Sequence, residues 1–356
     1  MREAMPDLRL VVDGQRYGGW QKIRVKRGIE QIANTFELGV TERWAGQDEP
    51  RPIRDGAVCQ VQIDRDPVIT GHVDDVLPTY DATSHTVSVT GRDATGDLVD
   101  CSAPPTQFAG RTLLEGATTL ARPYGIKVRA EVPVGGPFRT LKAEDGETVH
   151  EALEKAARIR AVLLISDGLG GLVITRAGRT RVATPLVLGQ NVLRASGTRS
   201  HRDRYRDYTV KGQAAGGAGL WDLGDDALER AQVLGRARDP GVARHRPLTV
   251  LAEDQVDGGS ARARADWECR VRVGRAQRVT YAVQGWHHAD GLWEPNTLVP
   301  VRDPYQGIDG DMLIVSVHYL LDEDGLRTEI EVVRKEAFEL IALPEPTTKG
   351  EGASTW

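Results

Sequence analysis

The chain has 356 residues, of which 40% are hydrophobic and 27% charged, and its formal net charge is -5. This length favours two to four domains, the composition is typical of a folded globular protein, and the lack of a basic excess argues against coating of duplex nucleic acid. No apolar run approaches the roughly 18 residues that span a bilayer, and residues 1–9 lack the apolar core of a signal peptide. We therefore expect assembly in a cytoplasm without membrane insertion.

The first hundred residues are dominated by short alternating strands. An Asp13-Gly14 turn follows the first of them, and further alternation predicts strands at residues 8–12, 36–40, 58–63 and 86–89. Such a series favours a small antiparallel barrel or sandwich. The three widely spaced cysteines, Cys59, Cys101 and Cys269, fit neither a disulfide framework nor a metal site, and we expect them to be buried.

A mixed segment begins after Pro104-Pro105. Apolar residues at helical spacing predict a helix near residues 113–120 that ends at Pro123, and a capping box of Thr148 and Glu151 predicts a second helix to about residue 158. A hairpin is expected from strands at 162–166 and 172–175. The glycines at 168–171 form its turn and not a phosphate loop, because neither a helix nor Lys-Ser/Thr follows them.

The next segment has weaker patterns. Residues 213–262 have weak periodicity and several glycines and prolines, which predicts an exposed and mobile loop-rich insertion. Residues 260–275 predict an amphipathic helix with Ser260 as N-cap and with Ala263, Trp267 and Val271 on one face. We expect this helix to cover the end of the barrel that follows it.

An internal repeat lies near the two ends of the chain. Residues 55–61 match 295–301 in pattern, and residues 71–76 match 311–317. In each copy a polar turn and a second alternating strand follow, at 86–89 and at 329–332. The repeat predicts two similar barrels with other domains inserted between them. The alternative is that any two hairpins share such alternation.

Several segments carry a resemblance to a known family. They are the opening strand with Asp13-Gly14 and Trp20, the strand at Phe36, and the segments PVITGHVDDV (67–76), VSVTGRDATGDLVD (87–100), LWEPNTLVPVRD (292–303) and GDMLIVSVHYLLDEDG (310–325). In their order and spacing the chain resembles the Mu-type tail protein P family, the baseplate hub, and more distantly the T-even hub and the late control protein D family. The resemblance covers nearly the whole chain.

The resemblance implies a mainly β fold with α+β insertions, in which two related small β-barrels accompany mixed α/β domains. We divide the chain into a first barrel (1–102), a mixed α/β domain (103–190), a second barrel (191–212 and 276–343), an inserted loop and helix region (213–275) and a flexible tail (344–356). It also implies a homotrimer in which six barrels surround a channel. Residues 36–38 and 330–332 are expected in these barrels.

Catalytic chemistry has weak candidates. The adjacent carboxylates at 74–75, 225–226 and 253–254 do not suit a glycosidase, because neighbours in a strand point to opposite faces. The same argument separates His287 from His288 as metal ligands. No nucleophile elbow is present. We therefore expect no catalytic, cofactor-binding or metal-binding residue, and no enzyme.

One basic stretch suggests a channel. Arg202, Arg204 and Arg206 alternate with other residues and are interleaved with Tyr205, so they could line a passage for DNA. The alternative is a solvated strand whose arginines pair with Asp203 and Asp207.

The expected function is that of a structural hub in the baseplate of a contractile phage tail. It would join the central spike to tail-tube or tape-measure proteins, contact other baseplate proteins and allow transient passage of DNA. It would assemble in the host cytoplasm and reside in the virion tail. The alternatives are a tail-associated cell-wall or polysaccharide hydrolase and a spike or hub module of a contractile secretion system.

Overall fold

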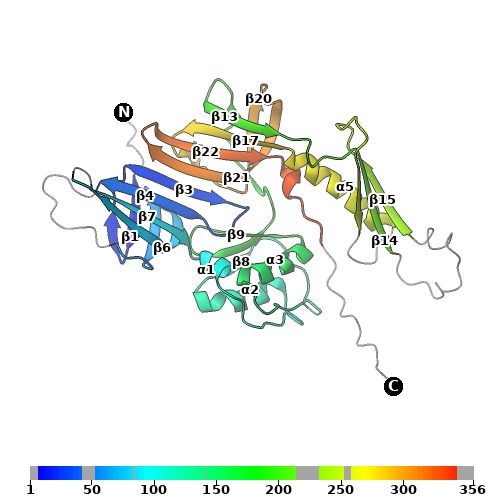
Figure 1. Ribbon diagram of the computed structural model, residues 1–356, viewed down its shortest axis with the longest axis horizontal. Coiled ribbons are helices and arrows are strands. Elements are labelled where there is room, and N and C mark those ends of the chain that lie inside the picture. The colour runs from blue at the N-terminus through cyan, green and yellow to red at the C-terminus, as the bar shows by residue number, and fades with distance from the viewer. Residues whose placement is uncertain are drawn as a thin grey trace, which may run out of the picture. The chain divides into compact units, whose positions relative to one another are not determined.

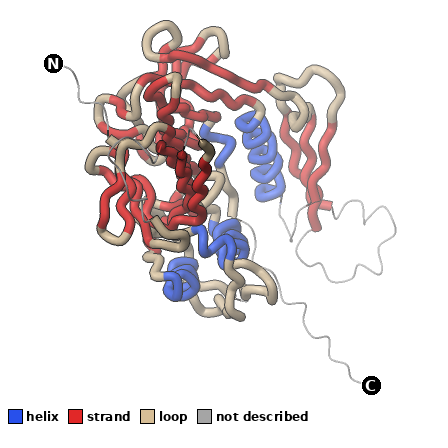
Figure 2. Tube along the Cα trace, turned by 60° about the vertical axis from the view of Figure 1, so that its left-hand side comes forward, coloured by secondary structure: helices blue, strands red, loops and turns tan. Residues whose placement is uncertain are grey.

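The computed structural model describes residues 7–41, 53–82, 85–139, 141–213, 232–251 and 258–342, and strands predominate in it (Figures 1 and 2). The chain divides into two compact units. The described part of the larger unit lies within Met1–Ala195 and Thr280–Val332, and that of the smaller unit lies within Ser196–Val279 and Val333–Pro344. The five-part division of the chain made from the sequence remains a prediction.

The N-terminal strands form one antiparallel arrangement in the order β3-β4-β7-β6-β5-β1-β2. Buried and half-buried residues alternate along β1 and β4, because successive side chains of a strand point to opposite faces. The four strands expected here are confirmed. The bounds are β1 (Leu8–Val12), β2 (Gln15–Tyr17), β3 (Lys22–Gly28), β4 (Thr35–Thr41), β5 (Val58–Ile63), β6 (Asp66–Tyr80) and β7 (His85–Asp93).

The C-terminal strands follow a matching order, β13-β17-β22-β21, with β20 paired to β21 and with β11 and β12 paired to β20. Strands β13 and β17 each run from one compact unit into the other. The bounds are β11 (Thr180–Arg181), β12 (Leu186–Val187), β13 (Val192–Arg199), β17 (Gln277–Gln284), β18 (His287–His288), β19 (Gly291–Leu292), β20 (Thr297–Asp303), β21 (Ile308–Asp322) and β22 (Gly325–Val333).

The internal repeat is confirmed in these strands. Strands β5, β6 and β7 have 6, 15 and 9 residues, and β20, β21 and β22 have 7, 15 and 9. Each set places its 15-residue strand in the middle. Strand β3 pairs with β21, so both copies belong to one 14-stranded sheet of the described chain (Figure 1). The mainly β architecture with α+β insertions is confirmed.

Between the two copies lies the mixed segment. Helices α2 and α3 each begin with a capping box, Thr112 with Glu115 and Thr148 with Glu151, which satisfies backbone N–H groups of the first turn. Both expected helices and the expected hairpin are confirmed. The Asp167 carboxylate closes the glycine turn by accepting from the N–H groups of Leu169 and Gly171, each at 2.8 Å. The bounds are α1 (Gly96–Asp100), α2 (Leu113–Ala121), η1 (Arg122–Tyr124), β8 (Val128–Ala130), α3 (Val149–Arg160), β9 (Leu163–Ser166) and β10 (Leu172–Thr175).

The smaller unit corrects the expected loop-rich insertion. Strand β14 (Asp207–Gln213) pairs with β15 (Gln232–Arg238) on one side and with β16 (Pro247–Leu251) on the other. Strands β15 and β16 were not predicted, because both are short and lie among the charged residues, glycines and prolines that indicated a loop. Residues 214–231 and 252–257 of the expected loop lie outside the described residues, and so does the expected tail at 344–356.

Helix α5 (Gly258–Arg275) exists as expected, but its predicted start was wrong, and of the three residues on its predicted face only Val271 is buried. Ser260 lies inside the helix and is not its N-cap. The helix buries Ala261, Ala265 and Val271, while Ala263 is exposed. Small residues face the sheet because β15 comes very close: a Cβ on Gly235 would lie 2.0 Å from the carbonyl oxygen of Ala261. The helix therefore packs on β14 and β15, with Val210 in the shared core, and is followed in this unit by η3 (Lys335–Phe338).

Two further expectations concern single residues and membranes. Cys59 is buried as expected, but Cys101 and Cys269 are only half-buried. Among the described residues, none of the helices has the length and apolar character needed to cross a membrane.

Candidate assembly interface

The joint between the two copies of the repeat is built by β3 and β21. Their antiparallel register runs from Ser316 opposite Gly28 to Leu321 opposite Ile23. Ile23 and Val25 are buried on one face of β3. Beyond the strand, the N–H of Ile29 donates to the carbonyl oxygen of Val315 at 3.0 Å. Within one chain, the edge strand β3 of the first repeat copy therefore pairs with the long strand β21 of the second repeat copy.

The buried side chain of Arg27, on β3, stabilises the same joint. Its buried guanidinium donates to Glu294 Oε1 at 3.3 Å and to the carbonyl oxygen of Asp167 at 3.5 Å. It borders a cleft of about 520 Å³ whose lining also includes Arg181. Arg181 pairs with Asp311 through two contacts at 2.8 and 2.9 Å. The two basic groups of this cleft are thus engaged in holding strands together.

The Gly-Arg-Asp segment of the resemblance also has a structural role. A Cβ on Gly91 would lie 2.3 Å from the carbonyl oxygen of His72 and 2.5 Å from the ring of Phe36, so only glycine fits here. Arg92 bridges Asp74 at 2.8 Å and Asp100 at 2.7 Å. Those hydrogen bonds tie β6, β7 and α1 together.

Asp93 is buried at the end of β7. It accepts from the N–H of Asn34 at 3.0 Å, and its other oxygen contacts the hydroxyl of Thr95. Burial raises the pKa of Asp93, although these hydrogen bonds act in the opposite direction. Thr95 has one proton and lies 2.5 Å from the carbonyl oxygen of Ile32. A protonated Asp93 would donate to Thr95, which then donates to Ile32.

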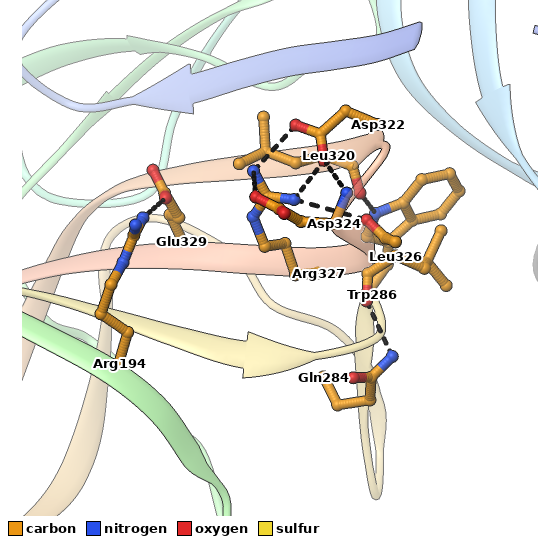
Figure 3. Close-up of polar contacts among 10 residues, drawn as sticks. Arg194, Gln284, Trp286, Leu320, Asp322, Asp324, Leu326, Arg327 and Glu329 are labelled. Carbon is orange, nitrogen blue, oxygen red and sulfur yellow. Dashed lines mark hydrogen bonds and ion pairs between the residues drawn. The ribbon is translucent and has the colours of Figure 1, made fainter. Parts of the chain in front are cut away.

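The far end of the β21–β22 hairpin is held by a polar network (Figure 3). The indole of Trp286 donates to the carbonyl oxygen of Leu320 at 3.1 Å, and Arg327 donates to Asp322 at 2.8 Å. The hydrogen bond from Arg327 lowers the pKa of Asp322. From β13, which β17 separates from β22 in the strand order, Arg194 donates to Glu329 of β22 at 2.6 Å. This pairing orients β13 at the end of the strand order.

The three predicted channel-lining arginines precede β14 in a turn, not in a strand. Arg204 binds Asp239 through two hydrogen bonds of 2.8 Å, and both side chains are largely buried. Arg206 binds Asp207 at 2.7 Å. Arg202 is exposed, and its carbonyl oxygen accepts from Arg246. The pair of Arg206 with Asp207 agrees with the alternative prediction that these arginines pair with nearby aspartates. Arg204 binds the more distant Asp239 instead of Asp203 or Asp207. Lining of a channel by these arginines remains a prediction.

The other chemical candidates are scattered. Asp74 is bound to Arg92, His287 lies 3.5 Å from Asp64, and the ring of His288 lies 4.9 Å from that of Trp293. Within the described ranges, no group of three or more His, Cys, Asp or Glu side chains could hold a metal ion. The carboxylate pairs 225–226 and 253–254 lie outside the described residues.

Strands β3 and β13 were not predicted from the sequence. The signal for β3 was present, since Ile23, Val25 and Arg27 are buried alternately, but the four basic residues of this strand obscure it. Strand β13 has few apolar residues and carries no comparable signal.

Three family models match this arrangement of repeated strands around an inserted mixed segment. They describe the Mu phage baseplate assembly protein GpP-like N-terminal domain (residues 7–93), the second domain of baseplate hub protein gp44-like proteins (95–176) and the fourth domain of Mu phage GpP (258–341). The fold and its joints are therefore those of a phage tail baseplate protein.

The baseplate hub protein gp44 of Escherichia phage Mu is 37% identical over 338 residues, which cover 92% of this chain and 88% of that protein. The chain belongs to the family of Mu-type baseplate hub proteins, and its role is structural. The expected family and the expected role as a structural baseplate hub protein are confirmed.

Solved structures agree with the family. A 43 kDa tail protein of prophage MuSo2 from Shewanella oneidensis is 37% identical, with a TM-score of 0.83, covering 94% of this chain and all of that one. A tail protein from Neisseria meningitidis is 23% identical, with a TM-score of 0.76, covering 95% of this chain and all of that one, and shows the same fold. An E. coli type VI secretion component shares the fold at 8% identity and a TM-score of 0.57, covering 95% of this chain and 80% of that one.

Proposed function

We propose that three copies of this chain form a closed ring, which joins the central spike of a contractile phage tail to its tube. The observation that carries the proposal is the repeat of β5, β6 and β7 as β20, β21 and β22 within one chain. Three chains with two similar strand arrangements each can offer a sixfold-like face to a hexameric tube and a threefold face to a trimeric spike.

The intrachain joint supports the ring. Strand β3 of the first copy binds β21 of the second copy, so the two copies meet through different surfaces. Contacts between unlike surfaces form rings when the rotation closes. A ring of this kind would assemble in the host cytoplasm and then bind other baseplate proteins.

A non-catalytic role fits the charged groups of the described residues. Arg27, Arg92 and Arg181 each bind carboxylates that belong to other elements. Such pairs hold strands in register and leave these groups occupied by structural contacts. Of the predicted channel residues, the exposed Arg202 is the one that we propose for contact with passing DNA.

Electron microscopy of the purified chain tests the ring. We expect class averages with threefold symmetry, a central opening and six similar lobes. Averages without a central opening would reject the ring. A second assay measures the loss of turbidity of a cell-wall suspension on addition of the purified chain. A loss greater than that with buffer alone would reject the non-catalytic role.

A further inference from the structure

We infer that β13 of one copy of the chain pairs, as an antiparallel strand, with residues 74–80 of β6 in a second copy. This inference rests on the proposed ring, and it names the strands through which neighbouring copies meet.

The first argument is an open edge on β6. Strand β21 pairs with β20 along Ile308–Leu313 and with β3 along Ser316–Leu321. Strand β6 has the same length and pairs with β5 only along Asp66–His72. Beyond that point β7 covers one side of β6, and among the described residues no strand of the chain pairs with the other side. The position that β3 occupies on β21 is therefore open on β6.

The second argument is an open edge on β13, the strand that corresponds to β3 in the other copy of the repeat. The strand order is β3-β4-β7-β6 in the first copy of the repeat and β13-β17-β22-β21 in the second copy. Strand β13 is thus the equivalent of β3. The free side of β3 is taken by β21, whereas β13 ends the strand order of the described chain (Figure 1). One chain carries one open edge of each kind, as a head-to-tail ring requires.

The third argument is exposed apolar surface at both edges. Leu77 of β6 is 52% exposed, whereas Tyr319, at the same place in the equally long β21, is fully buried beside β3. Tyr80 is 73% exposed, and Leu193 of β13 is 60% exposed. Apolar side chains at unpaired strand edges favour pairing with another chain.

The charges of the two edges are complementary. Residues 74–80 contain Asp74 and Asp75 and no basic residue, while β13 contains Arg194 and Arg199 and no acidic residue. Strand β3, which occupies the equivalent place in the chain, is likewise basic. Opposite charges across the contact favour this partner over a second copy of the same edge.

The intrachain joint also gives the direction of the contact. Ile23 at the start of β3 faces Leu321 near the end of β21. The start of β13 should therefore face the end of β6, which places Leu193 near Tyr80 of the neighbouring chain.

Cross-linking between two variants tests this contact. One carries Tyr80→Cys and the other Leu193→Cys, both in a background with Cys101→Ser and Cys269→Ser, because those two native thiols are half-buried. We expect a short bismaleimide to link two of the three chains into a dimer in each ring that contains both variants, and to link neither variant alone. A chain with both new cysteines should give products up to the trimer and none larger.

A matched control uses Leu169→Cys in place of Leu193→Cys. Leu169 is 57% exposed in the β9–β10 turn, so it is as accessible as Leu193 but lies on neither edge. Its mixture with the Tyr80→Cys variant should remain unlinked.

The outcomes separate this inference from the proposed ring. A trimeric mass without links between positions 80 and 193 overturns the strand assignment and leaves the ring in place. Links within the Tyr80→Cys variant alone overturn it in favour of a contact between like edges. A monomeric mass overturns both.

Discussion

At the scale of residues, the segment Gly91 to Asp93 is explained by packing and hydrogen bonding. Gly91 leaves room for the His72 carbonyl of β6 and for the Phe36 ring. Arg92 links three elements, and Asp93 completes a buried hydrogen-bond network with Asn34. The Gly-Arg-Asp sequence of this segment was one of the features that indicated the resemblance to the family. The physical reason for this sequence could not be predicted, because decisive partners such as Asn34, Phe36 and Asp74 lie in other parts of the chain.

Replacing Gly91→Ala should destabilise the larger unit by about 3 kcal/mol, since the new Cβ meets a backbone carbonyl that cannot easily move. Urea unfolding measures the effect. The matched control is Gly96→Ala, whose Cβ would have its nearest contact at 3.5 Å, and a change within about 0.5 kcal/mol is expected there. Equal losses for both variants would contradict the packing argument.

The pKa of Asp93 predicts a pH effect. Because burial raises this pKa above its ordinary value of 3.8, the unfolded chain loses the proton at a lower pH than the folded chain. The native protein should therefore be most favoured at low pH and lose stability as pH rises from the unfolded to the folded pKa. An Asp93→Asn variant should lack this loss. Parallel curves of unfolding free energy against pH for the two proteins would exclude the protonated carboxyl.

At the scale of elements, the sequence predicts strands well where apolar residues alternate and poorly where they do not. Strands β1, β4, β5 and β7 alternate clearly and were found. Strand β15 was missed because its Gly235 serves a close helix contact and only two of its seven residues, Val233 and Leu234, are large and apolar. The buried face of α5 was misjudged for the same reason, since alanine and not a larger residue faces the sheet.

Tertiary pairing was likewise beyond the sequence. The repeat indicated two similar units, but it did not reveal that β3 would join them, because register depends on both strands. The candidate assembly interface therefore emerged only with the strand order.

The smaller unit depends on the pair of Arg204 with Asp239. Burial by itself raises the pKa of Asp239, but hydrogen bonds from Arg204 and Gly241 outweigh it and lower the pKa. This stabilisation is therefore present above the ordinary pKa of 3.8 and is lost as pH falls through the lowered value.

Replacing Arg204→Met should cost about 3 kcal/mol, since it leaves a buried carboxylate without its partner. Hydrogen exchange of the β14 amides measures the loss. Arg206→Met is the control, because Arg206 and Asp207 are more exposed, and its cost should stay below about 1 kcal/mol. A larger effect of the control would show that the burial of Asp239 is not decisive.

At the scale of the whole molecule, the chain carries two copies of one strand arrangement, joined by unlike edges. One edge of each kind is left open in the described chain, the β21-like edge on β6 and the β3-like edge on β13. A lone chain would expose both edges, which natural sheets usually protect. Closure into a ring would cover them and also repeat the sheets around a channel.

The molar mass of the purified chain, measured by light scattering at micromolar concentration and moderate salt, tests this account most directly. The account predicts three times the mass of the chain, unchanged on moderate dilution. A mass equal to that of one chain would contradict the ring.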